Sequence, residues 1–327
     1  MLYRIPFIKT ADEIIDQAIR RGKKISVGDK DKRYREKKGL ITKIKIFVDT
    51  ITGELESYVK CFPSIDNLPL FYQELVDIKI NKNKLKKALG AVDWARKTII
   101  QIYNNEKHYI DKNMDIAVLK DKQRSIYGRL SSVVKQIKKE LLFLREASGV
   151  LRSFPDIEDT FTIVIAGYPN VGKSSFLRCI SNAKPRIAPY PFTTKEIHIG
   201  HIEKKERYTT RRYQVIDTPG LLDRPLEKRN KIERQAIAAL KYLADVIVFI
   251  MDPSESSGYS INQQEGLLSQ IKVLFPDTDI IIVENKKDIK QYDSPHLKIS
   301  CTTGEGVEEL KAKIIELIEK KEKERVG

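Results

Sequence analysis

The sequence is poor in cysteine and has no long apolar run, and these absences exclude several classes of protein. Its 327 residues include only three cysteines, which are Cys61, Cys179 and Cys301. An odd number of widely separated cysteines favours neither a disulfide framework nor a thiolate metal site, and it fits a reducing cytosol. The N-terminal stretch has no apolar core followed by small residues, so a secretory signal is not expected. No stretch approaches the roughly 18 apolar residues of a membrane span.

Positive charge is abundant, but it is confined to one half of the chain. The whole sequence has 60 Lys and Arg against 45 Asp and Glu, a formal net charge of +15. Residues 1–155 carry +14 of this excess, and residues 156–327 carry +1. A chain of this length allows roughly two domains. The charge shift therefore predicts a basic domain over 1–155, followed by a domain of different function over 156–327.

The first half has the pattern of an all-α domain. Thr10 and Glu13 have the spacing of a helix N-cap and its capping box. The segment 28–38 is highly charged, and we expect a loop or a helix end there. Apolar residues recur every three or four positions over 82–112 and again over 114–152. These two stripes predict amphipathic helices that pair as an antiparallel hairpin.

The charged faces of these helices are a candidate surface for an anionic partner. Lys and Arg side chains that neutralise phosphates release counterions and give sequence-independent affinity for RNA. Solvated helix faces are also commonly rich in lysine, but a domain-wide excess of positive charge favours an anionic partner. For Trp94 we expect core or rim packing rather than stacking on a base. The candidates outside the apolar stripes are Lys86, Lys87, Lys97, Arg129, Lys135, Lys138, Lys139 and Arg145.

The second half has the alternation of an α/β domain. After Pro155, short β-branched runs alternate with helical stretches, which predicts βαβ units and a mostly parallel sheet with helices on both faces. The runs 196–203 and 211–217 are separated by a short charged segment, and they predict an antiparallel hairpin at the edge of the sheet. A terminal amphipathic helix is expected over 306–325.

The first strand of this half runs directly into a phosphate-binding motif. Gly167-Tyr-Pro-Asn-Val-Gly-Lys-Ser174 has the spacing of a P-loop. Its glycines let backbone N–H groups approach a β-phosphate, Lys173 bridges the β- and γ-phosphates, and the Ser174 hydroxyl binds Mg²⁺. The helix that follows adds its positive N-terminal end. The candidate nucleotide-binding residues of this loop are Gly167, Asn170, Val171, Gly172, Lys173, Ser174 and Ser175.

A motif after a later strand favours guanine over adenine. Asn285-Lys-Lys-Asp288 follows an apolar run, at the carboxyl end of an expected parallel strand. The carboxylate of Asp288 can accept from both the ring N–H and the exocyclic amine of guanine, and adenine offers no such pair of donors. We expect Asn285 to tether this loop to the P-loop, and the stem of Lys286 to lie along the base. The candidate partners of the guanine carbonyl oxygen are the backbone N–H groups of Ser300, Cys301 and Thr302.

Two segments between these motifs could sense a γ-phosphate. In Asp217-Thr-Pro-Gly220, the Asp217 side chain can hold a water bound to Mg²⁺, and the Gly220 N–H can bond the γ-phosphate. In the loop 188–194, Thr194 is favoured over Thr193 as a second hydroxyl ligand of the metal. Loss of the γ-phosphate would release both segments, which is an order-to-disorder switch.

These motifs together resemble one branch of a known GTPase family. GYPNVGKSSF, YPFTTK, IDTPGLLDRPLEKRN and NKKD look like the Obg-related GTPases, and specifically like their Nog (nucleolar G-protein) branch. That branch also places a basic helical domain before the GTPase domain, whereas Obg proper begins with a glycine-rich domain. The resemblance implies GTP hydrolysis coupled to assembly of the large ribosomal subunit, with GTP and GDP as ligands and ribosomal RNA and pre-ribosomal particles as partners. We expect a short archaeal-type form in the cytoplasm, with no membrane partner and no obligate homo-oligomer.

The residue after the Asp-x-x-Gly motif bears on the rate of hydrolysis. Ras-like GTPases have a Gln there that orients the attacking water, but this chain has Leu221. We therefore expect slow intrinsic hydrolysis. In related GTPases an Asn at the position of Asn170 helps to hold a potassium ion, which predicts stimulation by K⁺, although a purely structural role in the loop is equally open. The candidate catalytic residues are Lys173, Thr194, Gly220 and Asn170.

Other interpretations of the same residues stay open. The protein could be a translation- or tRNA-associated RNA-binding GTPase, or a signalling-type switch whose helical domain binds protein. His198 and His201 lie three positions apart on an expected strand, hence on opposite faces, and they are a poor metal pair.

Overall fold

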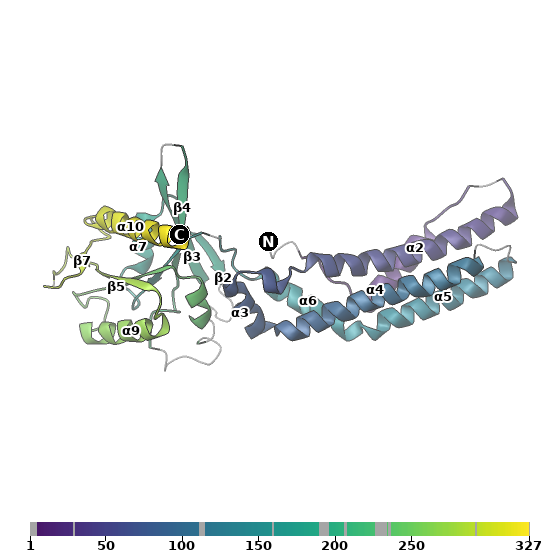
Figure 1. The fold of residues 1–327 in the computed structure, drawn as a ribbon, viewed down its shortest axis with the longest axis horizontal. Helices are drawn as coiled ribbons and strands as arrows, with labels where there is room; N and C mark the ends of the chain where they lie inside the picture. Colours follow the sequence, from purple (N-terminus) through teal and green to yellow (C-terminus); the bar gives the residue numbers. More distant parts are fainter. Residues whose placement is uncertain are drawn as a thin grey trace. The chain divides into compact units, whose positions relative to one another are not determined.

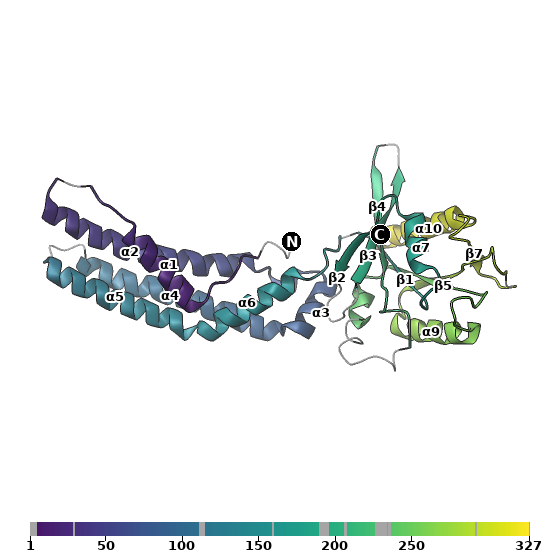
Figure 2. The same cartoon turned by 180° about the vertical axis from the view of Figure 1, so that it is seen from behind.

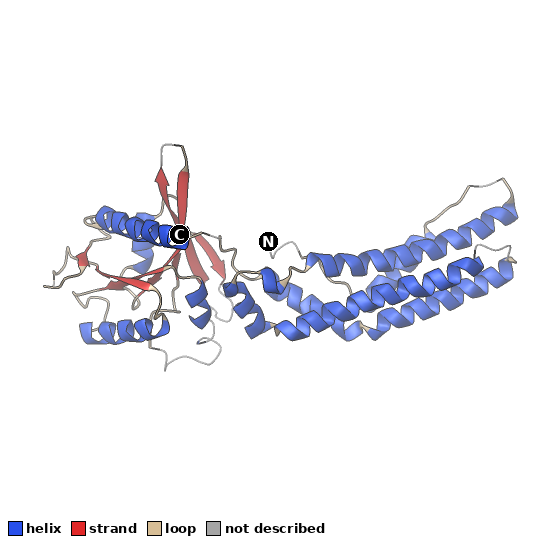
Figure 3. Cartoon of the chain, viewed as in Figure 1, coloured by secondary structure: helices blue, strands red, loops and turns tan. Residues whose placement is uncertain are grey.

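The computed structural model describes residues 5–28, 30–110, 115–158, 160–189, 196–205, 208–225, 234, 237–291 and 293–326. The chain divides into two compact units. The helical unit consists of Met1–Leu68 and Lys79–Ser153, and the α/β unit consists of Pro69–Ile78 and Phe154–Gly327. Among the described residues, all strands lie in the α/β unit (Figure 3).

The helical unit is a bundle of long helices (Figure 1). Its elements are α1 Ala11–Lys23, α2 Lys32–Cys61, the 3-10 turn η2 Ile65–Asn67, α4 Lys82–Ile110, α5 Ile116–Gln136 and α6 Lys138–Arg152. Helix α1 packs on α2, α2 packs on α4 and α5, and α4 packs on α5 and α6. The expected hairpin of two helices is therefore part of a larger bundle, to which α2 contributes 30 residues.

Local capping explains where the first two helices begin. The Thr10 side chain accepts the Glu13 N–H and the Glu13 side chain accepts the Thr10 N–H, so the predicted capping box is confirmed. The Asp31 carboxylate accepts the Arg33 N–H at 2.9 Å and starts α2 inside the charged segment 28–38. That segment is therefore in large part the first turns of a helix.

One feature of the bundle differs from the sequence prediction. The stripe over 114–152 is two helices rather than one, because Ile137 leaves helical geometry (φ −94°, ψ 19°) between α5 and α6. Ile137 itself is buried, so the apolar stripe continues through the break. Of the two kinds of packing expected for Trp94, core or rim, the exposed fraction of 49% fits the rim, because α4 turns the neighbouring Val92 and Ala95 inward.

The α/β unit is built on one seven-stranded sheet. Its strands are β1 Thr162–Ala166, β2 Arg186–Pro189, β3 Glu196–Lys205, β4 Thr210–Asp217, β5 Val246–Met251, β6 Asp279–Glu284 and β7 Leu297–Lys298. They lie in the order β2-β3-β4-β1-β5-β6-β7. The predicted β3–β4 hairpin is confirmed as antiparallel, but its position at the edge is wrong, because β2 pairs with β3 and takes the edge itself. The pairs from β4 through β7 are all parallel.

Helices lie on both faces of this sheet. The helices of the α/β unit are α3 Leu70–Lys79, α7 Lys173–Ile180, α9 Ile261–Leu274 and α10 Val307–Val326, with a 3-10 turn η4 at Leu240–Tyr242. Helices α7 and α10 lie on one face and α9 on the other (Figures 1 and 2). Every residue of β1 and β5 is buried, as expected for central strands of a covered parallel sheet.

Strand pairing determines where the functional loops meet. In the parallel register Ile165 lies beside Asp217, Ala166 lies beside Phe249, and Met251 lies beside Glu284. The carboxyl ends of β1, β4, β5 and β6 therefore share one edge of the sheet. Loops that follow such ends are where α/β sheets bind ligands.

Candidate nucleotide-binding site

The loop between β1 and α7 has the backbone of a phosphate-binding turn. Gly167, Asn170 and Gly172 have φ values of 137°, 64° and 106°, in the region that favours glycine. A Cβ on Gly167 would lie 2.4 Å from the carbonyl oxygen of Ile250, and one on Gly172 would lie 2.1 Å from Nδ2 of Asn285. Both glycines are therefore required by close approach as well as by φ.

An open cavity of about 410 Å³ lies against this loop. Lys173 is almost fully buried beside it, and its Nζ donates to the carbonyl oxygens of Gly167 at 2.8 Å and Tyr168 at 2.7 Å. Burial lowers the pKa of Lys173, and the carboxylates of Asp217 and Asp223 oppose that shift. The cavity is lined by Pro169, Asn170, Gly172, Lys173, Ser174, Ser175, Pro219 and Asp223.

Two oxygen donors at this site suit a magnesium ion. The Ser174 hydroxyl donates to Oδ2 of Asp217 at 2.6 Å, and Asp217 is completely buried. Its other oxygen, Oδ1, is buried with no hydrogen-bond partner among the described residues. A hydroxyl and a carboxylate are hard ligands that Mg²⁺ accepts together with water and phosphate oxygens. Thr194, the expected second hydroxyl ligand, lies outside the described residues.

Within the described ranges, no group of three or more His, Cys, Asp or Glu side chains is placed to hold a metal ion. His198 is separate from His201 and instead lies beside the magnesium candidates, with Nδ1 3.7 Å from Oδ2 of Asp217. Its interaction with that carboxylate raises the pKa of His198, and burial acts in the opposite direction. This position of His198 was not expected from the sequence.

The turn after β4 carries a carboxylate, that of Asp223, which was not expected at the site from the sequence. Gly220 has φ 78°, and its N–H donates to Oδ2 of Asp223 at 2.8 Å. Asp223 lines the same cavity as Lys173. The only sequence signal for this residue was its position three after the glycine of the Asp-x-x-Gly motif.

The same turn is fixed to the P-loop through its backbone. The N–H of Gly167 donates to the carbonyl oxygen of Leu222 at 3.0 Å. Leu221 and Leu222 are 1% and 3% exposed, so both side chains are anchored in the core. Leu221, which replaces the water-orienting glutamine of Ras-like proteins, therefore points into the protein.

One side chain joins the base motif to the P-loop. Nδ2 of Asn285 donates to the carbonyl oxygen of Val171 at 2.8 Å, and its Oδ1 accepts the N–H of Cys301 at 3.1 Å. The buried hydroxyl of Ser300 accepts the N–H groups of the two residues after Cys301, including Thr302 at 3.3 Å. The three loops after β1, β6 and β7 thus meet at Asn285.

Lys286 is held by a buried acid at the end of β5. Its Nζ lies 2.7 Å from Oδ2 of Asp252, a residue with no exposed surface. Burial opposes ionisation of Asp252, but hydrogen bonds from Lys286, Ser254 and the Ser257 N–H outweigh it and hold its pKa below the usual value. Asp288 is exposed at the end of the motif. The contact between Asp252 and Lys286 was not expected from the sequence, although an acidic residue directly after a buried strand was a visible signal.

The loop that Asp252 organises also reaches the P-loop. The ring of Tyr259 stacks on that of Tyr168, with centroids 4.2 Å apart. The side chain of Gln264 donates to the carbonyl oxygens of Asp252 and Tyr259, which fixes this loop to α9. These contacts join the loops after β5, β6 and β7 to the P-loop. Of the expected residues, Asn170, Lys173 and Ser174 line the cavity, Asp217 accepts from Ser174, and Asn285 bonds the P-loop.

Two sequence profiles of a single protein family match this chain. The NOG1 N-terminal helical domain matches residues 3–158, and nucleolar GTP-binding protein 1 (NOG1) matches residues 231–288. An uncharacterized protein of Methanocaldococcus jannaschii is 37% identical over 293 residues, which cover 88% of this chain and 80% of that protein. This chain belongs to the Nog1 family. The resemblance read from the motifs is thereby confirmed.

Nog1 relatives in eukaryotes are longer than this chain. Nucleolar GTP-binding protein 1 of Candida glabrata is 34% identical over 319 residues, which cover 94% of this chain and 48% of that protein. The Arabidopsis thaliana protein of the same name is 34% identical, with coverages of 94% and 46%. The chain therefore spans about half the length of these Nog1 relatives.

One solved structure of a similar protein can be compared with this chain. A Plasmodium falciparum protein described as nucleolar GTP-binding protein 1 is 35% identical and covers 53% of this chain and 94% of its own, with a TM-score of 0.46. Among the helices described for this Nog1-family chain, none combines the length and apolarity needed to cross a membrane.

Proposed function

We propose that this protein is a GTPase that binds GTP and GDP with Mg²⁺ and couples its nucleotide state to binding of ribosomal RNA during assembly of the large ribosomal subunit. The observation that carries the nucleotide part is the meeting of the P-loop and the Asn285–Asp288 motif through the Asn285 side chain. The names of the eukaryotic Nog1 relatives support the same ligand.

Guanine selectivity tests the nucleotide proposal most directly. The full chain would be titrated with fluorescent GDP in Mg²⁺ buffer, and the bound label would be displaced with GTP, GDP or ATP. We expect GTP to displace it at concentrations at least about 100-fold lower than ATP, because a site built to pair with specific donors rejects a ligand that lacks them. Equal displacement by ATP and GTP would contradict the assignment of the base motif.

The residues expected to surround the phosphates favour slow hydrolysis. Lys173 would hold the phosphates, and Ser174, Asp217 and Thr194 would hold Mg²⁺, which neutralises charge on the phosphate oxygens when it is bound. Leu221 offers no group to orient water and is buried. We therefore propose a low intrinsic rate that K⁺ or contact with a ribosomal particle raises.

Asn170 is the residue through which potassium would act. It lines the cavity, and its φ of 64° also suits it to a structural role in the loop. GTPase rates in KCl and NaCl at equal ionic strength separate these roles. A GTPase rate that is higher in KCl than in NaCl, with no such difference in Asn170→Ala, supports potassium binding. Equal rates of the wild-type protein in both salts would contradict potassium binding.

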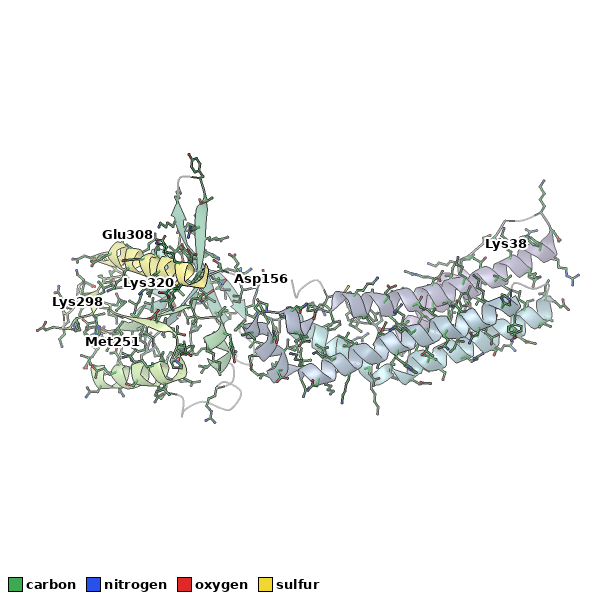
Figure 4. All side chains as sticks on the ribbon, in the orientation of Figure 1. Lys38, Asp156, Met251, Lys298, Glu308 and Lys320 are labelled. Carbon is green, nitrogen blue, oxygen red and sulfur yellow. The ribbon has the colours of Figure 1, made fainter. Side chains whose placement is uncertain are left out.

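The helical unit supplies the proposed RNA surface. Five of the eight candidate cations already face a carboxylate, for example Lys86 with Asp66 and Arg129 with Glu106. Among the described residues, the other three are exposed and have no ion-pair partner; they are Lys87, Lys135 and Lys139. Lys38 of α2, labelled in Figure 4, is exposed as well. These cations remain open to phosphate groups.

Sedimentation distinguishes the proposed role from its alternatives. A cell extract would be layered on a sucrose gradient with the full chain and either GDP or a non-hydrolysable GTP analogue. Nucleotide-dependent migration with large-subunit precursors supports assembly in the cytoplasm. Migration with mature ribosomes would indicate a translation factor, and absence from all ribosomal fractions would indicate a signalling switch.

A further inference from the structure

The carboxylate of Asp223 occupies a position that a GTPase is expected to keep for its substrate. Oδ2 of Asp223 accepts the N–H of Gly220 at 2.8 Å, and Asp223 lines the phosphate cavity together with Lys173. The Gly220 N–H is also the group that we expect to bond a γ-phosphate. The Gly220 N–H therefore has two possible acceptors, which are the carboxylate of Asp223 and the γ-phosphate of a bound GTP.

The backbone holds Asp223 at this place. Leu222 is anchored by its buried side chain and by the hydrogen bond that its carbonyl oxygen accepts from Gly167, the first glycine of the P-loop. Leu221 is buried on the other side of Gly220. Because both leucines are fixed, the Asp223 side chain can leave the cavity by rotation while the turn itself stays in place.

The electrostatics of the cavity make the competition unequal for the two nucleotides. The Asp223 carboxylate, like that of Asp217, favours the charged form of Lys173, as a bound phosphate would. A γ-phosphate would compete with Asp223 for both Lys173 and the Gly220 N–H, and the two anions repel at close range. GDP lacks the γ-phosphate, so it meets this conflict to a much smaller degree.

We propose that Asp223 is a specificity-determining residue that stands in for the γ-phosphate in the GTP-free protein and so weakens binding of GTP relative to GDP. This inference rests on the proposed guanine-nucleotide function. GTP binding then requires that the carboxylate be displaced from Gly220. The N–H that senses the γ-phosphate is thus never left without an acceptor in either state.

The test compares affinities for two nucleotides in the full chain. The dissociation constants of GDP and of GppNHp, a non-hydrolysable GTP analogue, would be measured with Mg²⁺ by isothermal titration calorimetry. The variants are Asp223→Asn, which keeps an acceptor for Gly220 but removes the charge, and Asp223→Ala, which removes both. Asp279→Asn is the control, because Asp279 pairs with Lys321 in the same unit and does not line the cavity.

The measured quantity is the ratio of the GppNHp constant to the GDP constant. We expect Asp223→Asn to lower this ratio by about fivefold or more, since one like charge is removed at close range, and Asp223→Ala to lower it further. Asp279→Asn should leave the ratio unchanged. Retained GDP binding shows that each variant is folded.

Two different results would overturn two different claims. A ratio that stays within about twofold of wild type in Asp223→Ala, or that rises, contradicts the role of Asp223 while leaving guanine-nucleotide binding intact. Failure of the wild-type protein to bind either nucleotide contradicts the proposed function itself.

Discussion

The helical unit and the α/β unit both contain many charged side chains, but they place them differently. In the helical unit the cations stand on exposed helix faces, and their ion pairs are largely at the surface, such as Lys60 with Glu56. In the α/β unit the ends of parallel strands bring Lys173, Asp217 and Asp252 into buried positions, each with a specific partner. A single substitution in the α/β unit should therefore change ligand binding strongly. Single substitutions of cations in the helical unit should each change binding only slightly, and their effects should add up.

Glu54 is a partial exception within the helical unit. Its carboxylate accepts from Nζ of Lys9 at 2.7 Å, from Gln17 at 2.9 Å and from the hydroxyl of Tyr58 at 3.1 Å. Tyr58 is 1% exposed, and burial is the main cause that raises its pKa. This cluster gives the helical unit one polar site that resembles those of the α/β unit.

The largest expected effect is the loss of the P-loop lysine. Lys173→Ala should weaken GTP binding by about 100-fold or more, because truncating one partner of a buried charged contact costs about 2–5 kcal/mol. Competition against fluorescent GDP measures it. Lys184→Ala removes an exposed lysine from the same unit and is the control. Similar affinities in both variants would show that burial does not set the size of the effect.

A methyl group at Gly172 should disconnect the P-loop from the base motif. Gly172→Ala would place a Cβ 2.1 Å from Nδ2 of Asn285, so we expect nucleotide affinity to fall by roughly tenfold or more. Gly258→Ala has the same kind of positive φ, but nothing lies within 4 Å of its Cβ. It should cost only about 1–2 kcal/mol of unfolding free energy from the backbone conformation. If both variants bind nucleotide equally well, the close contact with Asn285 is not needed.

Acid should weaken the Glu54 cluster. Burial opposes ionisation of Glu54, but hydrogen bonds from Lys9, Gln17 and Tyr58 outweigh it and hold its pKa below the usual value. A lowered folded-state pKa means that the ionised group stabilises the fold above the ordinary Glu pKa of about 4.3, and that this contribution is lost as pH falls through the folded-state value. Glu54→Gln should therefore lower the unfolding free energy by about 1 kcal/mol at neutral pH, and by less in acid.

Urea unfolding at pH 7 and at pH 3 measures this difference. Glu56→Gln breaks an exposed pair with Lys60 on the same helix, and its effect should be close to zero at both pH values. A Glu54 effect that is the same at both pH values would contradict the assignment to the ionised form.

The smallest single effects are expected at the exposed lysines. Replacing Lys87, Lys135 and Lys139 together by Gln should lower the slope of log K against log salt for RNA binding by up to about one unit per lysine that contacts a phosphate. Filter binding of the full chain to ribosomal RNA measures the slope. The matched control replaces Lys86, Lys97 and Lys138, which already face carboxylates, and should change it less. An unchanged slope in the first variant would contradict the proposal that these three lysines contact RNA phosphates.

The sequence predicted most of the α/β fold because its signals are local. The P-loop is contiguous, and strands such as β1 and β5 are short apolar runs of the kind that a covered parallel sheet produces. The edge position of β2 was missed because this strand has four residues and ends at Pro189, which gives a weak strand signal. The break at Ile137 was missed because no proline or glycine marks it and the apolar stripe runs through it.

The missed parts of the candidate site depend on contacts between distant segments. Asp252 meets Lys286 from 34 positions away, and His198 meets Asp217 only because β3 folds back beside β4. Asp223 lies at the cavity because the carbonyl oxygen of the preceding Leu222 accepts a hydrogen bond from Gly167, a glycine in another loop. Residue type and spacing predict which loops bind ligand, but strand register decides which side chains in those loops face each other.

The position of Asn285 has a consequence for how a ligand is held. Its Nδ2 donates to the P-loop, which is expected to bind phosphate, and its Oδ1 accepts from the loop after β7, which is expected to bind the base. A nucleotide then acts as a chelating ligand: once one end is bound, the other is presented to its own loop at high effective concentration. Inorganic phosphate or guanosine alone forgoes that advantage. Neither fragment should approach the affinity of the intact nucleotide, and the two added together should not restore it.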